Sequence, residues 1–315
     1  MKKLKKLFLT CLMLLSWFVP LNGITVKDVP IIPHSWNHPE QRKSEIALTS
    51  LFRDEADYLE EWIEFHRLIG VSHFYLYNNL SQDHYLEVLK PYIASGVVEL
   101  FDVPFESNTY NDGARTHNFV QVCCYNHAIS LAKNNNTWLA IIDSDEFICP
   151  VKDLSLSKAL KRYSYAGGVV VYWQMYGTSN VWELEPNELM IEKLLLKAPN
   201  DGHHTQFKSI VRPKYAECKD PHYTTVGKKR LVIPTHQDFS HARKFDAHPV
   251  DILRINHYHF RTEFFYWNQK RPRRSQWGDN PSSEDASARI DYHNSEYDPC
   301  MLPFVDKLKR RLNKE

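Results

Sequence analysis

The sequence predicts an α/β fold in which a mostly parallel β-sheet is flanked by helices in a single domain. Short apolar segments alternate with amphipathic helical segments from residue 45 to residue 173, the pattern of parallel strands joined by right-handed crossovers. The segment Trp138–Ile142 is apolar throughout, as expected for a strand buried on both faces. The chain has 315 residues, of which 43% are hydrophobic, so it can bury one large core.

The N-terminal residues 1–23 are predicted to lie outside this fold. Four lysines among the first six residues precede the apolar run Leu7–Leu21, and Gly23 follows it. A basic start, a short apolar stretch and a small residue are typical of a signal peptide. An uncleaved signal-anchor fits as well, because Pro20 disturbs the cleavage site. The protein is therefore expected to be exported, or to be associated with a membrane through this segment. Residues 24–44 are interpreted as a linker.

The first strand is predicted at Glu45–Leu51 and the first helix directly after it. Asp54 is expected to cap this helix, which has one apolar face and ends at Gly70. The elements that follow are a strand, a polar turn, a helix and a third strand, at residues 71–77, 78–83, 85–94 and 97–103.

A polar loop at residues 104–116 separates the third strand from a helix expected at 117–133 and the apolar strand after it. The later predicted elements are a helix, a strand and a helix, at residues 156–163, 168–173 and 189–195. The second half is less regular and rich in His, Arg and Pro, which suits ligand-binding loops and packing elements within one domain. The domain is predicted to span residues 45–272, and residues 273–315 to form a C-terminal extension.

The apolar strand stops abruptly at three acids, Asp143, Asp145 and Glu146. Residues i and i+2 of an extended chain point the same way, so Asp143 and Asp145 are expected to aim two carboxylates at one point. That point lies beyond the carboxyl edge of the sheet, where open α/β sheets bind ligands. Carboxylates favour Mg²⁺ or Mn²⁺, typically shared with a substrate's phosphates. The alternative is a strand followed by a plain acidic turn.

Charge and cysteine content exclude several classes of protein. The net charge of +1 argues against a nucleic-acid-binding protein driven by bulk electrostatics. Five cysteines remain after the leader, without a CxxC pair or a dense spacing, which argues against a cysteine zinc site and a disulfide framework. A single bridge between Cys218 and Cys300 remains compatible with the sequence.

Several motifs occur in a fixed order between residues 46 and 272. They are residues 51–66, residues 70–79, Leu89-Lys90-Pro91-Tyr92, Gln121 with Tyr125-Asn126, residues 142–147, residues 173–179, residues 208–213 and Asn256-His257-Tyr258. As an ordered set they resemble glycosyltransferase family 92 and related bacterial glycosyltransferases with the GT-A fold, a Rossmann-like architecture. Two positions depart from the family pattern: no acid precedes Asn78-Asn79, and Asn180 stands where the family commonly has glycine.

The resemblance implies a metal-dependent, inverting transfer of a sugar from a nucleotide-sugar donor to a glycan or another hydroxyl acceptor. Galactose carried by uridine diphosphate is the donor that the family suggests. The donor-binding residues predicted on this basis are Arg53, Glu55, Asn78, Asn79, Asp83, Gln121, Asn126, Asp143 and Lys208. Each has a structural alternative, such as a charged helix start for Arg53 and Glu55 or a plain turn for the asparagines.

The resemblance also implies a metal site and a catalytic base. Asp143, Asp145 and His257 are predicted to converge on one Mn²⁺ or Mg²⁺, with the donor diphosphate filling the remaining positions. An inverting transferase needs a carboxylate that accepts the proton of the acceptor hydroxyl. Glu183 is the first candidate for this base, because its segment follows the Gly177-Thr178-Ser179 turn, and Asp112 is the second.

Two other classes of protein remain as alternatives at this point. A metal-dependent phosphohydrolase or nuclease also uses acids at a strand end, although no His-x-His-x-Asp motif accompanies them here. A non-catalytic sugar-binding protein on a transferase scaffold would not need intact Asp143 and Asp145.

Overall fold

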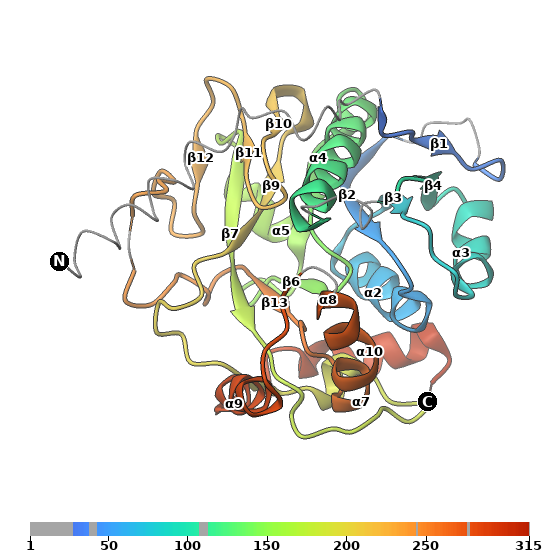
Figure 1. The fold of residues 1–315 in the computed structure, drawn as a ribbon. Coiled ribbons are helices and arrows are strands. Elements are labelled where there is room, and N and C mark those ends of the chain that lie inside the picture. The colour runs from blue at the N-terminus through green and yellow to red at the C-terminus, as the bar shows by residue number, and fades with distance from the viewer. Residues whose placement is uncertain (1–27, 38–42, 107–112, 244, 276–277, 315) are drawn as a thin grey trace.

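The structure is a computed structural model, and it describes residues 28–37, 43–106, 113–243, 245–275 and 278–314. Its centre is a ten-stranded sheet with the order β1-β4-β3-β2-β5-β9-β7-β13-β6, in which β12 also pairs with β7 (Figure 1). Only β1, β9 and β6 run against the other strands of this sheet. The predicted fold class, a mostly parallel sheet flanked by helices, is confirmed.

The N-terminal half contains the regular parallel part of the sheet. Its strands are β2 (Ser44–Phe52), β3 (His73–Asn78), β4 (Val98–Asp102) and β5 (Asn136–Ile141), and its helices are α2 (Ala56–Ile69), α3 (Tyr85–Ala94) and α4 (Gly113–Ala132). Part of the predicted linker forms β1 (Ile32–Pro33), which pairs with β4. Each predicted strand and helix of this half is present, with ends shifted by a few residues at most.

Alternate residues of β2 face opposite sides of the sheet, and each side has its own core. Ile46 and Leu48 pack into the core that contains α2 and α3, whereas Ala47 and Leu51 pack into the core beneath α4. Because the strand is apolar on both faces, helices can cover both faces. The carboxyl ends of the parallel strands are left open between these layers.

The start of helix α2 differs from the prediction. Asp54 has a positive φ of 54°, and Glu55 occupies the cap position without a side-chain cap bond. The free N–H of Ala56 donates instead to Asp83 Oδ2 at 2.7 Å, and Asp54 Oδ1 accepts from the backbone of Gln82 at 2.7 Å. The cap therefore comes from the next loop of the sheet, a contact that local sequence spacing does not reveal.

The second half of the sheet is mixed. It contains β9 (Phe207–Val211) between β5 and β7 (Gly168–Met175), followed by β13 (Arg254–His257) and β6 (Glu146–Cys149). Short elements surround it: α5 (Leu156–Lys161), α6 (Met190–Lys193), β8 (Leu196–Lys197), η4 (Pro213–Tyr215), β10 (Glu217–Cys218), β11 (Thr224–Thr225) and β12 (Leu231–Val232).

Strands β5 and β6 are consecutive in the sequence but lie four strand spacings apart in the sheet order. In a flat sheet these spacings would add up to about 19 Å. The five residue steps from Ile141 to Glu146 reach about 17 Å when fully extended, and they include a turn. The sheet therefore curls around residues 142–145, which connect its two parts.

The C-terminal residues pack into the same core as the sheet. They form α7 (Glu263–Phe265), the π-helical turn η5 (Tyr266–Lys270), α8 (Arg271–Ser275), α9 (Ser283–His293), β14 (Glu296–Tyr297) and α10 (Leu302–Leu312). Phe304 of α10 stacks edge-on against Phe65 of α2, and Arg311 pairs with Glu64 at 2.9 Å. The predicted boundary after residue 272 thus does not separate two packing units.

Two further predictions concern the N-terminal leader and a bridge between Cys218 and Cys300. The predicted leader lies outside the described residues, and none of the helices that are described has the length and apolarity needed to cross a membrane. Cys218 and Cys300 are both free thiols, so the bridge considered for them is wrong. Cys300 lies instead beside Cys149, with the sulfur atoms 3.6 Å apart.

Candidate active site at the carboxyl edge of the sheet

A cavity of about 830 Å³ opens at the carboxyl edge of the parallel strands. Its lining comes from the loop after β2, the start of α4, the acidic turn at residues 143–146, the end of β13 and the segment from η5 to α9. The predicted site residues that line it are Arg53, Glu55, Asn79, Gln121, Asp143, Asp145 and His257. The structure therefore brings together residues from five separate motifs of the sequence.

The acids lie in a tight turn rather than on an extended strand. The chain leaves β5 at Ile141, and the Glu146 N–H donates to the carbonyl of Asp143 at 3.2 Å. Oxygen atoms of Asp143, Asp145 and Glu146 lie within 4.8 Å of one another. The expected convergence of carboxylates is present, but strand alternation is the wrong reason for it, and the third acid takes part as well.

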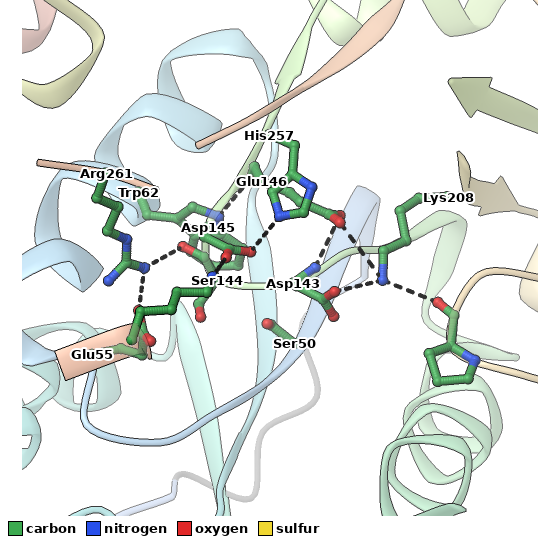
Figure 2. Close-up of polar contacts among 12 residues, drawn as sticks. Ser50, Glu55, Trp62, Asp143, Ser144, Asp145, Glu146, Lys208, His257 and Arg261 are labelled. Carbon is green, nitrogen blue, oxygen red and sulfur yellow. Dashed lines mark hydrogen bonds and ion pairs between the residues drawn. The ribbon is translucent and has the colours of Figure 1, made fainter. Parts of the chain in front are cut away.

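Asp143 is held by groups of the sheet and of helix α4. Its Oδ2 accepts from Lys208 Nζ at 2.8 Å (Figure 2). Its Oδ1 accepts from Gln121 at 3.1 Å and from the Tyr125 hydroxyl at 3.0 Å. Burial alone would raise the pKa of Asp143, but the Lys208 ammonium outweighs it and holds the pKa below its ordinary value. Asp143 is therefore ionised and fully supplied with partners.

Lys208 lies beneath the cavity rather than on its wall. It is fully buried on β9, and its Nζ also donates to the Pro221 carbonyl at 3.1 Å and lies 3.7 Å from Glu146 Oε1. Lys208 was predicted to contact the donor. The structure assigns it instead to neutralising Asp143 from below.

Glu146 is buried without full charge compensation. Its side chain has no exposed surface, and its Oε2 accepts from the Asp143 N–H at 3.1 Å. Burial raises the pKa of Glu146 well above its ordinary value, although Lys208 opposes the shift. Its backbone carbonyl accepts from Trp62 Nε1 of α2 at 2.7 Å, which ties the acidic turn to the core below it.

Asp145 points to the opposite side, toward the C-terminal residues. Lys270 Nζ lies 2.5 Å from its Oδ2, and His257 Nε2 lies 3.3 Å from its Oδ1. Burial alone would raise the pKa of Asp145, but Lys270 and His257 reverse this and hold the pKa well below its usual range. The carboxylate is thus ionised, with both oxygens engaged by cationic or ionisable side chains.

The residues around Asp145 fit a divalent cation. Ligand atoms of Asp145, His257 and His259 lie within 4.8 Å of one another, and this group shares Asp145 with the three-acid group. His257 Nδ1 is buried and lacks a hydrogen-bond partner among the described residues. Carboxylate oxygen with imidazole nitrogen is a donor set that Mn²⁺ accepts. Asp143 and His257 do not belong to one group, so the predicted ligand set is met only in part. His259 was not predicted, although the His257-Tyr258-His259 spacing could have suggested it.

A buried arginine supports the acidic turn from the other side. Arg261 is fully buried, forms an ion pair with Glu55, and its Nη2 lies 3.5 Å from the carbonyl of Ser144 (Figure 2). Its guanidinium stacks on the ring of Tyr58 at 3.8 Å. Glu55 therefore positions Arg261, and both brace the turn; Arg261 was not predicted, because it follows the last motif without a recognisable pattern.

Several predicted donor-binding residues serve the fold. Asn78 uses its amide on Tyr85, Asp102 and the Ser81 backbone, and it does not line the cavity. Asn126 exchanges two hydrogen bonds with the backbone of Cys218. Asp83 likewise caps helix α2. All three residues thus hold segments of the fold together, which is the structural alternative to donor binding for each of them.

Glu183, the predicted base, is exposed and is not among the residues that line the cavity. Asp112, the second candidate, lies outside the described residues. The acids on the cavity wall, as far as the chain is described, are Asp54, Glu55, Asp143 and Asp145. The geometry thus gives Glu183 no contact with the site.

Fold and site together define a class: α/β proteins with a buried carboxylate cluster and a polar cavity at the carboxyl edge of a mostly parallel sheet. The model of glycosyltransferase family 92 matches residues 43–295, which is most of the chain. The chain therefore belongs to glycosyltransferase family 92.

Similar proteins are found among plant proteins and solved structures. A glycosyltransferase family 92 protein of Oryza sativa subsp. japonica is 26% identical over 73% of this chain and 35% of its own length, and one of Ricinus communis is 27% identical over 70% and 36%. The chain thus spans about a third of the length of these relatives. Residues 1–349 of S. aureus TarS give a TM-score of 0.36 with 8% identity, covering 78% of this chain and 69% of that one.

Proposed function

We propose that this protein is a metal-dependent glycosyltransferase that moves a sugar from a nucleotide-diphosphate sugar to a glycan or another hydroxyl acceptor. The observation that carries the proposal is the pair Asp143 and Asp145, set in a braced turn at the wall of the cavity. Membership of family 92 supports the reaction class.

Asp145 with His257 and His259, or Asp145 with Asp143 and Glu146, would hold the divalent cation. When bound there, such a cation neutralises negative charge that develops on a diphosphate leaving group. We propose Mn²⁺ or Mg²⁺, since oxygen ligands predominate at the turn.

Cationic side chains on the cavity wall suit the donor's diphosphate. Arg53, Lys270, Arg273 and Arg274 line the cavity, and arginine forks match phosphate oxygens in pairs. The low exposure of Asp145, at 14% of its side-chain surface, keeps bulk water from the carboxylate, which strengthens electrostatic contacts inside the site. A hexose such as galactose, and inversion at the anomeric carbon, complete the proposal.

The test is a panel of nucleotide sugars screened by thermal unfolding with and without Mn²⁺. A ligand that binds only the native state raises the melting temperature by mass action, so the correct donor is expected to stabilise the protein only when Mn²⁺ is present. Transfer is then measured with that donor and a set of glycan acceptors. Asp145→Asn serves as the matched control, because it removes one charge and keeps the shape.

Two outcomes of the same assay would contradict the proposal. Metal-dependent hydrolysis of phosphate esters without any acceptor would identify a phosphohydrolase. Binding of sugars without metal and without turnover would identify a non-catalytic sugar-binding protein.

A further inference from the structure

Asp145 already carries a cation supplied by the protein. The Lys270 ammonium lies 2.5 Å from one oxygen of the carboxylate, and His257 lies 3.3 Å from the other. A divalent cation on Asp145 would therefore stand within a few ångströms of Lys270. Like charges at that distance repel strongly when water is largely excluded, so Lys270 and the metal cannot share Asp145 in this arrangement.

The two lysines of the acidic turn are held very differently. Lys208 comes from the central strand β9, has no exposed side-chain surface and contacts Asp143, Glu146 and the Pro221 carbonyl. Lys270 lines the cavity, and Asp145 is its one hydrogen-bond acceptor among the described residues. Breaking a single contact frees Lys270, whereas moving Lys208 would empty a fully buried site.

The backbone around Lys270 is also unusual. Lys270 ends the π-helical turn Tyr266–Lys270, and α8 (Arg271–Ser275) continues directly from it. Such π-helical turns interrupt regular helices and are frequent at functional sites. The same short segment places Arg273 and Arg274 on the cavity wall, so a Lys270 side chain that leaves Asp145 swings along a surface where a diphosphate would meet three cations.

We propose that Lys270 is the resident counter-ion of Asp145, that metal binding displaces it, and that the displaced ammonium then binds the donor's diphosphate. This inference rests on the proposed function and adds a coupling that the function alone does not require. When the metal binds alone, the Lys270–Asp145 contact is lost and nothing replaces it. When a diphosphate binds as well, the displaced ammonium gains a new partner. Metal and diphosphate should therefore bind with positive cooperativity.

The experiment compares full-length wild type with Lys270→Met, which keeps the length of the side chain and removes its charge. Binding of Mn²⁺ alone is measured by electron paramagnetic resonance, and binding of inorganic pyrophosphate in the presence of Mn²⁺ by calorimetry. If most wild-type molecules have Lys270 paired with Asp145, the apparent Mn²⁺ affinity equals the intrinsic affinity multiplied by the fraction of molecules in which Asp145 is free. Lys270→Met is therefore expected to bind Mn²⁺ about tenfold more tightly or better, and pyrophosphate more weakly.

The opposite signs separate this role from a structural one, because a damaged site would weaken both ligands. Arg271→Met is the matched control: it removes a positive charge from the neighbouring residue, which contacts the Pro281 carbonyl and the Trp267 ring rather than Asp145. Its Mn²⁺ affinity should change by less than about threefold, as expected for a charge partly screened by solvent.

Equal Mn²⁺ affinities of Lys270→Met and Arg271→Met, or weaker Mn²⁺ binding by folded Lys270→Met, would overturn the inference. If circular dichroism shows that Lys270→Met is unfolded, Lys270→Gln takes its place with the same expected signs. Neither measurement uses a sugar donor, so a protein without transferase activity would contradict the proposed function and still allow the displacement to be tested.

Discussion

The two sides of the acidic turn differ in how their charges are satisfied. On the sheet side, Asp143 receives hydrogen bonds from Lys208, Gln121 and Tyr125, and all of these partners lie on β9 or α4. On the C-terminal side, Asp145 meets Lys270 and His257, and the buried atoms His257 Nδ1, Arg261 Nε and Arg261 Nη1 have no hydrogen-bond partner among the described residues.

This difference indicates a division of labour. Hydrogen bonds to both carboxylate oxygens of Asp143 add rigidity, so the sheet side fixes the position of the turn. Unsatisfied buried polar atoms cost free energy, and one of them, His257 Nδ1, belongs to a residue on the cavity wall. We therefore expect substitutions on the sheet side to change stability, and those on the C-terminal side to change ligand binding.

The largest effect is expected for Asp145→Asn, which should reduce sugar transfer by about a hundredfold or more, the scale on which loss of one preorganised electrostatic group acts. The fold should remain, because the amide oxygen of the new side chain can still accept a hydrogen bond from Lys270. Transfer kinetics measure the loss of activity, and the thermal melting curve shows whether the fold remains. Full activity in Asp145→Asn would remove the metal-dependent mechanism.

Next in size is the stability difference between the two lysines. Lys208→Met leaves Asp143 and the fully buried Glu146 without their cation, and should lower the free energy of unfolding by about 3–5 kcal/mol. Lys270→Met should cost clearly less, since Asp145 keeps His257 as a second partner and Lys270 lies on the cavity wall rather than at a fully buried position. Urea unfolding of both variants provides the comparison, and equal losses would show that both sides of the turn are structural.

A pH titration of stability tests how the acidic turn is anchored to the core beneath it. His66 is fully buried; its Nδ1 lies 2.8 Å from the Trp62 carbonyl, and its Nε2 accepts from Ile148 of β6 at 3.2 Å. Burial lowers the pKa of His66 to about 3. Because the folded pKa is depressed, this contribution to stability is complete above about pH 6.5 and is lost as the pH falls, by about 2 kcal/mol at pH 5.

Denaturant unfolding at pH 7.5 and pH 5 measures this loss. His66→Gln keeps an amide that can donate and accept, and has no proton to gain. The fall in stability between the two pH values should therefore be smaller in His66→Gln than in wild type. An identical pH dependence in both proteins would show that other groups account for the acid sensitivity.

The smallest effect is expected for Glu183→Gln. Its side chain is exposed and lies apart from the cavity lining, so transfer should change by less than about threefold, well below the hundredfold or more typical of a lost general base. Steady-state kinetics with the donor found in the screen is the measurement. A hundredfold loss would restore Glu183 as the base and require the segment around it to move toward the cavity.

The sequence predicted the N-terminal half of the fold well because its signals are local. Strand–helix alternation located β2 to β5, and Gly70, with a φ of 117°, ends α2 as predicted. The cap of α2 was wrong because Asp83 reaches it from another loop. The mixed half, in which β9 and β6 run antiparallel to their neighbours, has no comparable local pattern.

The site could be predicted where a motif places residues next to one another. The acidic turn and His257 were identified, whereas Lys270 and Arg261 were not, because each reaches the turn from more than a hundred residues away. Asn78, at the carboxyl end of β3, and Asn126, within α4, have a residue type that suits donor binding. Their amides are already used within the fold, and a sequence cannot report that competition.

The curl of the sheet around residues 142–145 has a consequence for how this domain can be divided. The turn that holds the acids is also the shortest covalent link between the regular parallel strands and the last two strands of the sheet order. A protein engineer who separates the chain at Ile142 therefore breaks the sheet and the acid cluster with one cut. A chimera that joins the two halves of two relatives would keep the sheet intact only if this turn matches the strand spacing on both sides.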